Sequence, residues 1–196
     1  MRVSESDRPE GVGGELRRAA WCIAAGILIL VAPLPGCRAS NVKGGVMNLT
    51  STSFQGSQIP AKFTCNGAGI SPQLGWSAPP AGTVSLALIV TDPDAPGRTF
   101  VHWVIYDLPA ETRALPEGLP GLGQLADGSR QGRNDFDEIG YGGPCPPGNS
   151  AHHYHFTLYA LDAKLSLPVG ETRAQLEAAM RGHVLARGEL IGLYQR

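Results

Sequence analysis

The sequence has few cysteines, little excess charge and no long apolar run. Its 16 Lys and Arg residues nearly balance 17 Asp and Glu residues, for a formal net charge of −1. Proteins that bind nucleic acid by neutralising many phosphates need a basic surface, so the composition argues against that class. Four cysteines are too few for a disulfide-rich scaffold. No apolar run reaches the roughly 20 residues that a membrane-spanning helix needs.

Glycine and proline are abundant instead, with 26 and 16 residues in a chain of 196. They divide the chain into short segments, which favours β structure over long helices. The strongest strand candidates are rich in β-branched and aliphatic residues and are bounded by proline or glycine. They are residues 83–90, 99–108 and 154–161, with weaker candidates at 46–51, 59–63, 73–76 and 184–194. One short C-terminal helix is expected after Thr172, which forms a capping box with Gln175, and a long Gly/Pro-rich loop covers residues 116–150.

Residues 1–45 are interpreted as an export signal followed by a tether. The apolar run at 21–32 follows Arg17 and Arg18 and has the length of a signal-peptide core, with a buried core helix as the alternative. Leu-Pro-Gly-Cys at residues 34–37 resembles a bacterial lipobox. This predicts a lipoprotein-type signal peptide over residues 1–36, lipidation of Cys37, and a flexible tether over residues 37–45. The protein is then expected in the cell envelope, outside the cytoplasm and held to the membrane by its lipid alone. Translation from Met47 would instead give a cytoplasmic protein.

The remaining cysteines fit the export interpretation. With Cys22 removed and Cys37 acylated, the pair Cys65 and Cys145 remains. In an oxidising compartment an even remainder indicates one disulfide, and two free buried thiols are the alternative.

Two segments place a proline-rich turn next to a strand that carries histidine. The first runs through residues 92–96 to His102, and the second through residues 141–147 to His152 and Tyr154. Proline rings hold such turns in one shape, and side-chain alternation puts His152 and Tyr154 on one face of their strand. Asp92 or Asp94 could hydrogen-bond His102 and favour its charged form. Two imidazoles, a hydroxyl and a carboxylate in one hollow would suit a phosphate ester.

These motifs resemble the phosphatidylethanolamine-binding protein family, in particular its bacterial Raf-kinase-inhibitor-like branch. The resemblance rests on Asp-Pro-Asp-Ala-Pro at 92–96, His-Trp at 102–103 and Gly-Pro-Cys-Pro-Pro at 143–147, and it covers about residues 46–196 as one domain. It implies a mostly β fold, a Greek-key β-sandwich of two antiparallel sheets, with a pocket for phosphate-bearing head groups or small anions. Carried over to this sequence, the pocket residues are Asp92, Asp94, Pro96, His102, Gly143, Pro146, His152 and Tyr154.

The leading hypothesis is a non-catalytic binding protein for a small anionic or phosphorylated ligand, without cofactor or metal. The sequence contains neither a Gly-x-Ser-x-Gly nucleophile elbow nor a His-Glu-x-x-His zinc motif. His153 and His155 share a strand face, but no third metal ligand accompanies them. One alternative is an inhibitor of a protease or another, unknown protein that acts through the loop at 116–150. The other is a phosphoester hydrolase built on Asp92, His102 and His152.

Overall fold

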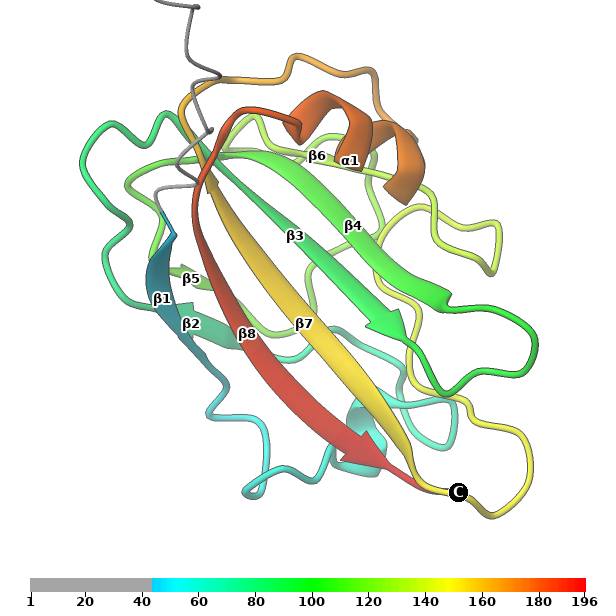
Figure 1. Cartoon of the computed structure of the whole chain (residues 1–196). Coiled ribbons are helices and arrows are strands. Elements are labelled where there is room, and N and C mark those ends of the chain that lie inside the picture. The colour runs from blue at the N-terminus through cyan, green and yellow to red at the C-terminus, as the bar shows by residue number, and fades with distance from the viewer. Residues whose placement is uncertain (1–43) are drawn as a thin grey trace, which may run out of the picture. The chain divides into compact units, whose positions relative to one another are not determined.

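The computed structural model describes residues 44–196, and the predictions for the signal peptide and for lipidation of Cys37 lie outside them. The described residues form eight strands, one 3-10 helix and one α-helix (Figure 1). No helix within residues 44–196 is long and apolar enough to cross a membrane. In chain order the elements are β1 (Gly45–Thr50), η1 (Ala61–Phe63), β2 (Leu74–Trp76), β3 (Ser85–Asp92), β4 (Phe100–Pro109), β5 (Ala114–Leu115), β6 (Arg130–Gln131), β7 (His152–Leu161), α1 (Arg173–Met180) and β8 (Val184–Tyr194).

Most of the predicted strands are present, with ends displaced by one or two residues. The three strongest candidates correspond to β3, β4 and β7, and residues 184–194 form β8 as predicted. Residues 59–63 were predicted as a strand, and this is wrong. They contain η1, in which Phe63 N donates to Pro60 O at 3.0 Å and Thr64 N donates to Ala61 O at 3.0 Å. Strand β1 begins at Gly45, within the predicted tether.

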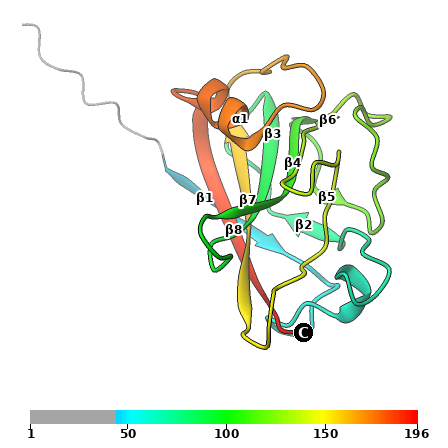
Figure 2. The same cartoon turned by 90° about the vertical axis from the view of Figure 1, so that its right-hand side faces the viewer.

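The strands form one mixed, curled sheet in the order β5-β2-β1-β8-β7-β3-β4-β6. The expectation of two antiparallel sheets is therefore corrected, because β1 runs parallel to β8 and joins all strands into one series. The first four residues of β1 pair with β8, whereas Leu49 and Thr50 pair with β2 on the other side. The sheet turns at β1, so that β2 and β5 lie behind the long strand β8 in Figure 1 and to the right of β7 and β8 in Figure 2.

The middle strands of the sheet are buried on both faces. Alternate residues of β3 and Trp103 of β4 belong to the larger core cluster, inside the curl of the sheet. On the opposite face, Ala87 and Ile89 pack in a second cluster with Leu176 and Met180 of α1. Burial on both faces explains why β3 is a continuous apolar run rather than an alternating one. The capping box between Thr172 and Gln175 is confirmed and fixes the start of α1.

The long loop after β5 is held against the sheet by buried polar contacts. Gln131, in the short strand β6, accepts a hydrogen bond from Trp103 Nε1 at 2.8 Å. Its amide nitrogen donates to Pro120 O and to Leu122 O, each at 2.8 Å. The side chain of Gln131 is almost fully buried, so breaking these contacts would leave polar groups unpaired. The loop therefore reaches residues 134–147 along a defined path.

Candidate ligand pocket

The sheet order brings the end of β3 beside the beginnings of β4 and β7. Strand β3 is antiparallel to both neighbours, with Asp92 opposite Phe100 of β4 and Thr91 opposite His155 of β7. The last residue of β3 therefore lies close to His152, the first residue of β7. His152 Nδ1 donates to Asp92 Oδ2 at 2.7 Å. Both side chains are buried, at 3% exposure for Asp92 and 5% for His152.

Asp92 also shapes the proline-rich turn that follows it. Its second carboxylate oxygen, Oδ1, accepts a hydrogen bond from the backbone N–H of Asp94 at 2.8 Å. Both oxygens of this carboxylate are thus engaged, one by the turn and one by His152. Because a buried carboxylate is costly without partners, this pairing stabilises the corner at which β3 ends.

His102 has a different partner from the one expected. Its Nδ1 donates to Gly142 O at 2.8 Å, and Gly142 N donates back to the backbone oxygen of His102 at 2.8 Å. The expected pairing of His102 with Asp92 or Asp94 is therefore corrected, since Asp92 binds His152. Burial lowers the pKa of His102, and the hydrogen bond to Gly142 O together with the nearby carboxylates of Asp92 and Asp135 offsets only part of this effect.

The ring of Tyr154 packs against the ring of His102. The two rings are 5.1 Å apart between centroids, in an edge-on arrangement. Within residues 44–196, Tyr154 Oη is the only buried side-chain nitrogen or oxygen without a hydrogen-bond partner. Burial and the neighbouring Asp92 carboxylate raise the pKa of this phenol, so it stays protonated and keeps a proton to donate.

A cavity of about 210 Å³ opens beside these residues. Asp92 and His102 supply its ionisable groups, and the remaining lining side chains are mostly apolar. The lining residues are Asp92, Ala95, Pro96, Phe100, His102, Phe136, Cys145, Pro146 and Pro147. Of the predicted pocket residues, Asp92, Pro96, His102 and Pro146 line the cavity directly. His152 and Tyr154 do not line the cavity themselves. His152 bonds Asp92 and Tyr154 packs against His102, and both of these partners line it.

Sequence reasoning missed Phe100 and Phe136 as pocket residues. The Phe136 ring packs edge-on against Phe100 at 4.8 Å and against His102 at 5.4 Å, and so covers one side of the imidazole. Gly142 permits this contact, because a Cβ there would lie 2.6 Å from Phe136 Cε2. The only signal in the sequence was an apolar residue standing in a glycine-rich loop.

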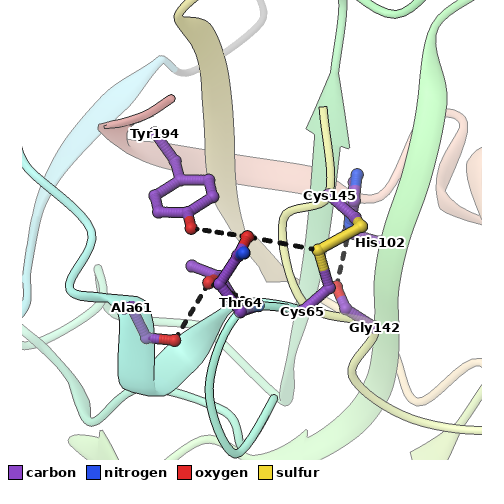
Figure 3. The surroundings of a disulfide bond; sticks show 8 residues. Ala61, Thr64, Cys65, His102, Gly142, Cys145 and Tyr194 are labelled. Carbon is purple, nitrogen blue, oxygen red and sulfur yellow. Dashed lines mark hydrogen bonds between the residues drawn. A yellow bond between two sulfur atoms is a disulfide. The ribbon is translucent and has the colours of Figure 1, made fainter. Parts of the chain in front are cut away.

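A disulfide fixes the second proline-rich turn to the segment after η1 (Figure 3). The structure joins Cys65 and Cys145, the two cysteines paired by the sequence analysis, with their Cα atoms 5.4 Å apart. The backbone N–H of Cys65 also donates to Pro144 O at 3.0 Å. Gly143 packs against this segment rather than into the cavity, since a Cβ would lie 2.9 Å from Phe63 O. Gly143 thus allows its backbone to lie close to the backbone of Phe63 and Thr64, and it does not line the cavity.

Asp94 does not line the cavity. Its carboxylate accepts hydrogen bonds from the backbone N–H and the Nδ1 of His153, at 2.8 and 2.7 Å, and both side chains are about half exposed. The bond from the backbone N–H is the main reason that the pKa of Asp94 is lowered. His155 bonds Glu189 at 3.0 Å. No cluster of metal-ligating side chains is found within residues 44–196.

A larger hollow of about 490 Å³ lies between the N-terminal turn of α1 and the loop after β6. Each of the three arginines that line it is already paired with a carboxylate of the same hollow. The pairs are Arg98 with Asp135 at 2.8 Å, Arg133 with Asp137 at 2.9 Å and Arg173 with Glu177 at 2.7 Å. The cavity of about 210 Å³ is the better candidate for a ligand site, because the second ring nitrogen of His102 has no hydrogen-bond partner among the described residues.

Comparison with known proteins shows the family to which the chain belongs. Residues 50–195 match the family model described as phosphatidylethanolamine-binding protein. The chain belongs to the phosphatidylethanolamine-binding protein family. A UPF0098 protein of Aquifex aeolicus is 48% identical over 156 residues, covering 78% of this chain and 91% of the relative. Another, from the archaeon Methanothermobacter thermautotrophicus, is 48% identical over 151 residues, covering 76% of this chain and 99% of the relative.

Two solved structures support the same family and fold. CT736 of Chlamydia trachomatis, described as a homologue of phosphatidylethanolamine-binding protein, has a TM-score of 0.70 at 43% identity, covering 77% of this chain and 98% of that one. YbcL of E. coli, described as a member of the mammalian family, has a TM-score of 0.70 at 34% identity, covering 76% and 98%. The resemblance read from the motifs is confirmed, and the curated relatives include archaeal as well as bacterial proteins.

Proposed function

We propose that the cavity beside His102 binds a small anionic or phosphorylated ligand and that the protein is a binding module, not an enzyme. The observation that carries this proposal is the convergence of His102 and the Asp92–His152 pair on one cavity enclosed by aromatic and proline rings. A volume of about 210 Å³ matches a ligand the size of a phosphate ester rather than a long acyl chain.

The hydrogen-bonding groups fit such a ligand. His102 uses only one ring nitrogen, in its bond to Gly142, so its second ring nitrogen is available to a ligand in the cavity. The rings of Phe100, Phe136 and the prolines would contact the substituent of the ester and exclude water, which strengthens polar contacts. The family's name describes binding of a phospholipid in which a phosphate diester joins ethanolamine to the lipid, and phosphoethanolamine is the corresponding monoester.

The lining side chains support the non-catalytic proposal. They include no serine or threonine, and the sulfur of Cys145 is held in the disulfide, so neither a hydroxyl nor a free thiol is placed for nucleophilic attack. The purified protein is expected not to hydrolyse phosphoester substrates. Turnover that disappears in His102→Ala would overturn this part of the proposal.

Isothermal titration calorimetry with inorganic phosphate and phosphoethanolamine tests the binding function. The full chain should bind at least one of them saturably, and His102→Ala should lose at least tenfold in affinity. His183→Ala is the control, because His183, like His102, uses its Nδ1 in a hydrogen bond, here to Asp162 at 2.8 Å, but lies outside the cavity. No saturable binding of either ligand by the full chain would refute the proposal.

We also propose that the protein is exported and anchored through Cys37. The Cys65–Cys145 disulfide supports this, because such bonds persist in oxidising compartments outside the cytoplasm. Mass spectrometry of the mature protein should find lipid-modified Cys37 at its N-terminus. A mature chain that retains residues 1–36, or that begins at Met47, would refute the proposal.

A further inference from the structure

The hydrogen bond to Gly142 fixes which nitrogen of His102 carries a proton. A carbonyl oxygen only accepts, so Nδ1 at 2.8 Å from Gly142 O must be the donor. In a neutral imidazole the other nitrogen, Nε2, then holds a lone pair and can only accept. Figure 3 shows one ring nitrogen directed at Gly142 and the other directed away from it.

Nε2 of His102 must reach open space. It has no hydrogen-bond partner within residues 44–196, yet Tyr154 Oη is the only unpartnered polar side-chain atom that is sealed from solvent there. The open space that His102 lines is the cavity. Toward a ligand, the neutral ring of His102 therefore presents an acceptor.

The Asp92–His152 pair adds no free donor while His152 is neutral. Its Nδ1 donates to Asp92 Oδ2, so its Nε2 would likewise hold a lone pair. Asp92 contributes a negative charge, and both of its oxygens are engaged. A fully ionised oxyanion has only acceptors, so among the ionisable side chains of the cavity it would in this state meet a lone pair and a carboxylate.

We propose that the cavity binds an oxyanion together with a proton, and that this proton lies between the ligand and His102 Nε2. The inference rests on the binding function proposed above. A phosphate monoester can bring the proton as its own P–OH group, which donates to Nε2. The doubly ionised monoester instead binds with uptake of one proton from solvent onto Nε2, and the imidazolium N–H then donates to the ligand. Both routes give a complex with the same number of protons.

The charged groups around His102 agree with this assignment. From β3, Asp92 faces the ring, and from the loop after β6, Asp135 acts on it while itself bonded to Arg98 at 2.8 Å. From β7, Tyr154 contacts the ring as a neutral phenol. Phe100 and Phe136 cover it with apolar surface. No described cation pairs with His102 itself, so a bound anion would be the partner that makes its protonation favourable.

The ligand class expected at this site is a phosphate monoester. A phosphate monoester loses its second proton at a pKa of about 6, so it can supply the proton near neutral pH. A phosphodiester has no P–OH group and must rely on protonation of His102. The cavity should therefore prefer methyl phosphate over dimethyl phosphate.

Calorimetry of the full chain in buffers of different ionisation enthalpy tests the inference. With methyl phosphate at pH 8, the enthalpy should depend on the buffer by an amount equal to uptake of about one proton. Between pH 7 and pH 8 the affinity should fall about tenfold, the slope for one linked proton. At pH 5.5, where the monoester already carries its proton, the uptake should be smaller.

A matched pair of variants locates the proton. His102→Asn keeps an amide N–H for Gly142 O but lacks Nε2, and it should abolish the proton uptake and weaken binding at pH 8 by at least tenfold. His183→Asn replaces a histidine outside the cavity and should keep both. Unfolding curves of both variants check that each is folded.

The outcomes separate the two proposals. Methyl phosphate that fails to bind at any pH from 5.5 to 8 refutes the binding function. Binding with buffer-independent enthalpy and equal affinity at pH 7 and pH 8 leaves that function standing and overturns the proton inference. Uptake that persists in a folded His102→Asn variant also overturns it.

Discussion

Removing the disulfide by the double substitution Cys65→Ser and Cys145→Ser should lower the free energy of unfolding by about 4 kcal/mol. The two cysteines are 80 residues apart in the sequence, so the bond closes a long loop in the unfolded chain. The chain-entropy model gives about 4.5 kcal/mol for a loop of this length, and residual structure in the unfolded chain reduces that figure.

The native fold should survive the loss of the bond. The Cys65 N–H still donates to Pro144 O at 3.0 Å, and the Tyr141 hydroxyl still donates to Phe63 O at 2.9 Å. These contacts hold the second proline-rich turn against the segment around η1. The main effect is therefore expected on the unfolded state, which gains freedom, and less on the cavity wall that Cys145 forms.

Urea unfolding followed by tryptophan fluorescence measures the effect. The double variant should unfold at a lower urea concentration with an equal or steeper slope, because its unfolded chain exposes more surface. The full chain also contains Cys22 and Cys37, so both proteins should be compared under one reducing condition and one non-reducing condition. Reduced wild type should approach the double variant. A loss below about 1 kcal/mol would refute the loop-closure reasoning, since the model predicts several times more.

Two further predictions concern His102 and its cover. Gly142→Ala should lower the free energy of unfolding by about 1–3 kcal/mol, because the new methyl group displaces Phe136. In a Phe136→Ala background this loss should be smaller by at least about 1 kcal/mol. A double-mutant cycle of unfolding free energies that shows no coupling would contradict this contact. Burial lowers the pKa of His102 below its ordinary 6.5, so the unfolded chain takes up this proton first. The stability due to neutral His102 should be complete above pH 6.5 and decrease as the pH falls through its folded pKa. NMR titration of the His102 ring checks this, and a midpoint above 6.5 without ligand would exclude it.

Strands that are buried on both faces were readable from the sequence, whereas the shortest elements were not. Strands β3 and β4 are long apolar runs between prolines, a pattern that few other elements share. Strands β5 and β6 have two residues each, too few to show any periodicity. In the segment predicted as a strand at 59–63, Ile59 and Phe63 are both buried, but Ala61–Phe63 form a single 3-10 turn.

The curled single sheet was not predictable from local patterns. It depends on the parallel pairing of β1 with β8, two strands from opposite ends of the described chain. Nothing in the alternation of either strand encodes the direction of a partner that far away. The expected two-sheet description was implied by the resemblance to the family and did not follow from the residues.

Within the site, alternation along one strand was reliable, and pairing between strands was less so. His152 and Tyr154 face the interior while His153 is exposed, as the period of two requires. The partner of Asp92 was misassigned because residue 92 is nearer in sequence to His102 than to His152. Strand β3 lies between β4 and β7, so its last carboxylate has a neighbour on each side, and in the structure it bonds His152 of β7. The contribution of Phe136 depended on the path of the loop after β6, which sequence does not give.

Asp92 is the residue whose presence most needs explaining in a pocket proposed for anions, because a buried carboxylate repels them. Its two hydrogen bonds account for it: one fixes the turn through Asp94 N, and the other orients His152. If the cavity binds anions as proposed, this charge would disfavour a doubly ionised ligand unless a proton enters with it. A small neutral donor would meet no such barrier. The negative charge of Asp92 would therefore act in specificity, favouring ligands that carry or acquire a proton over those that cannot.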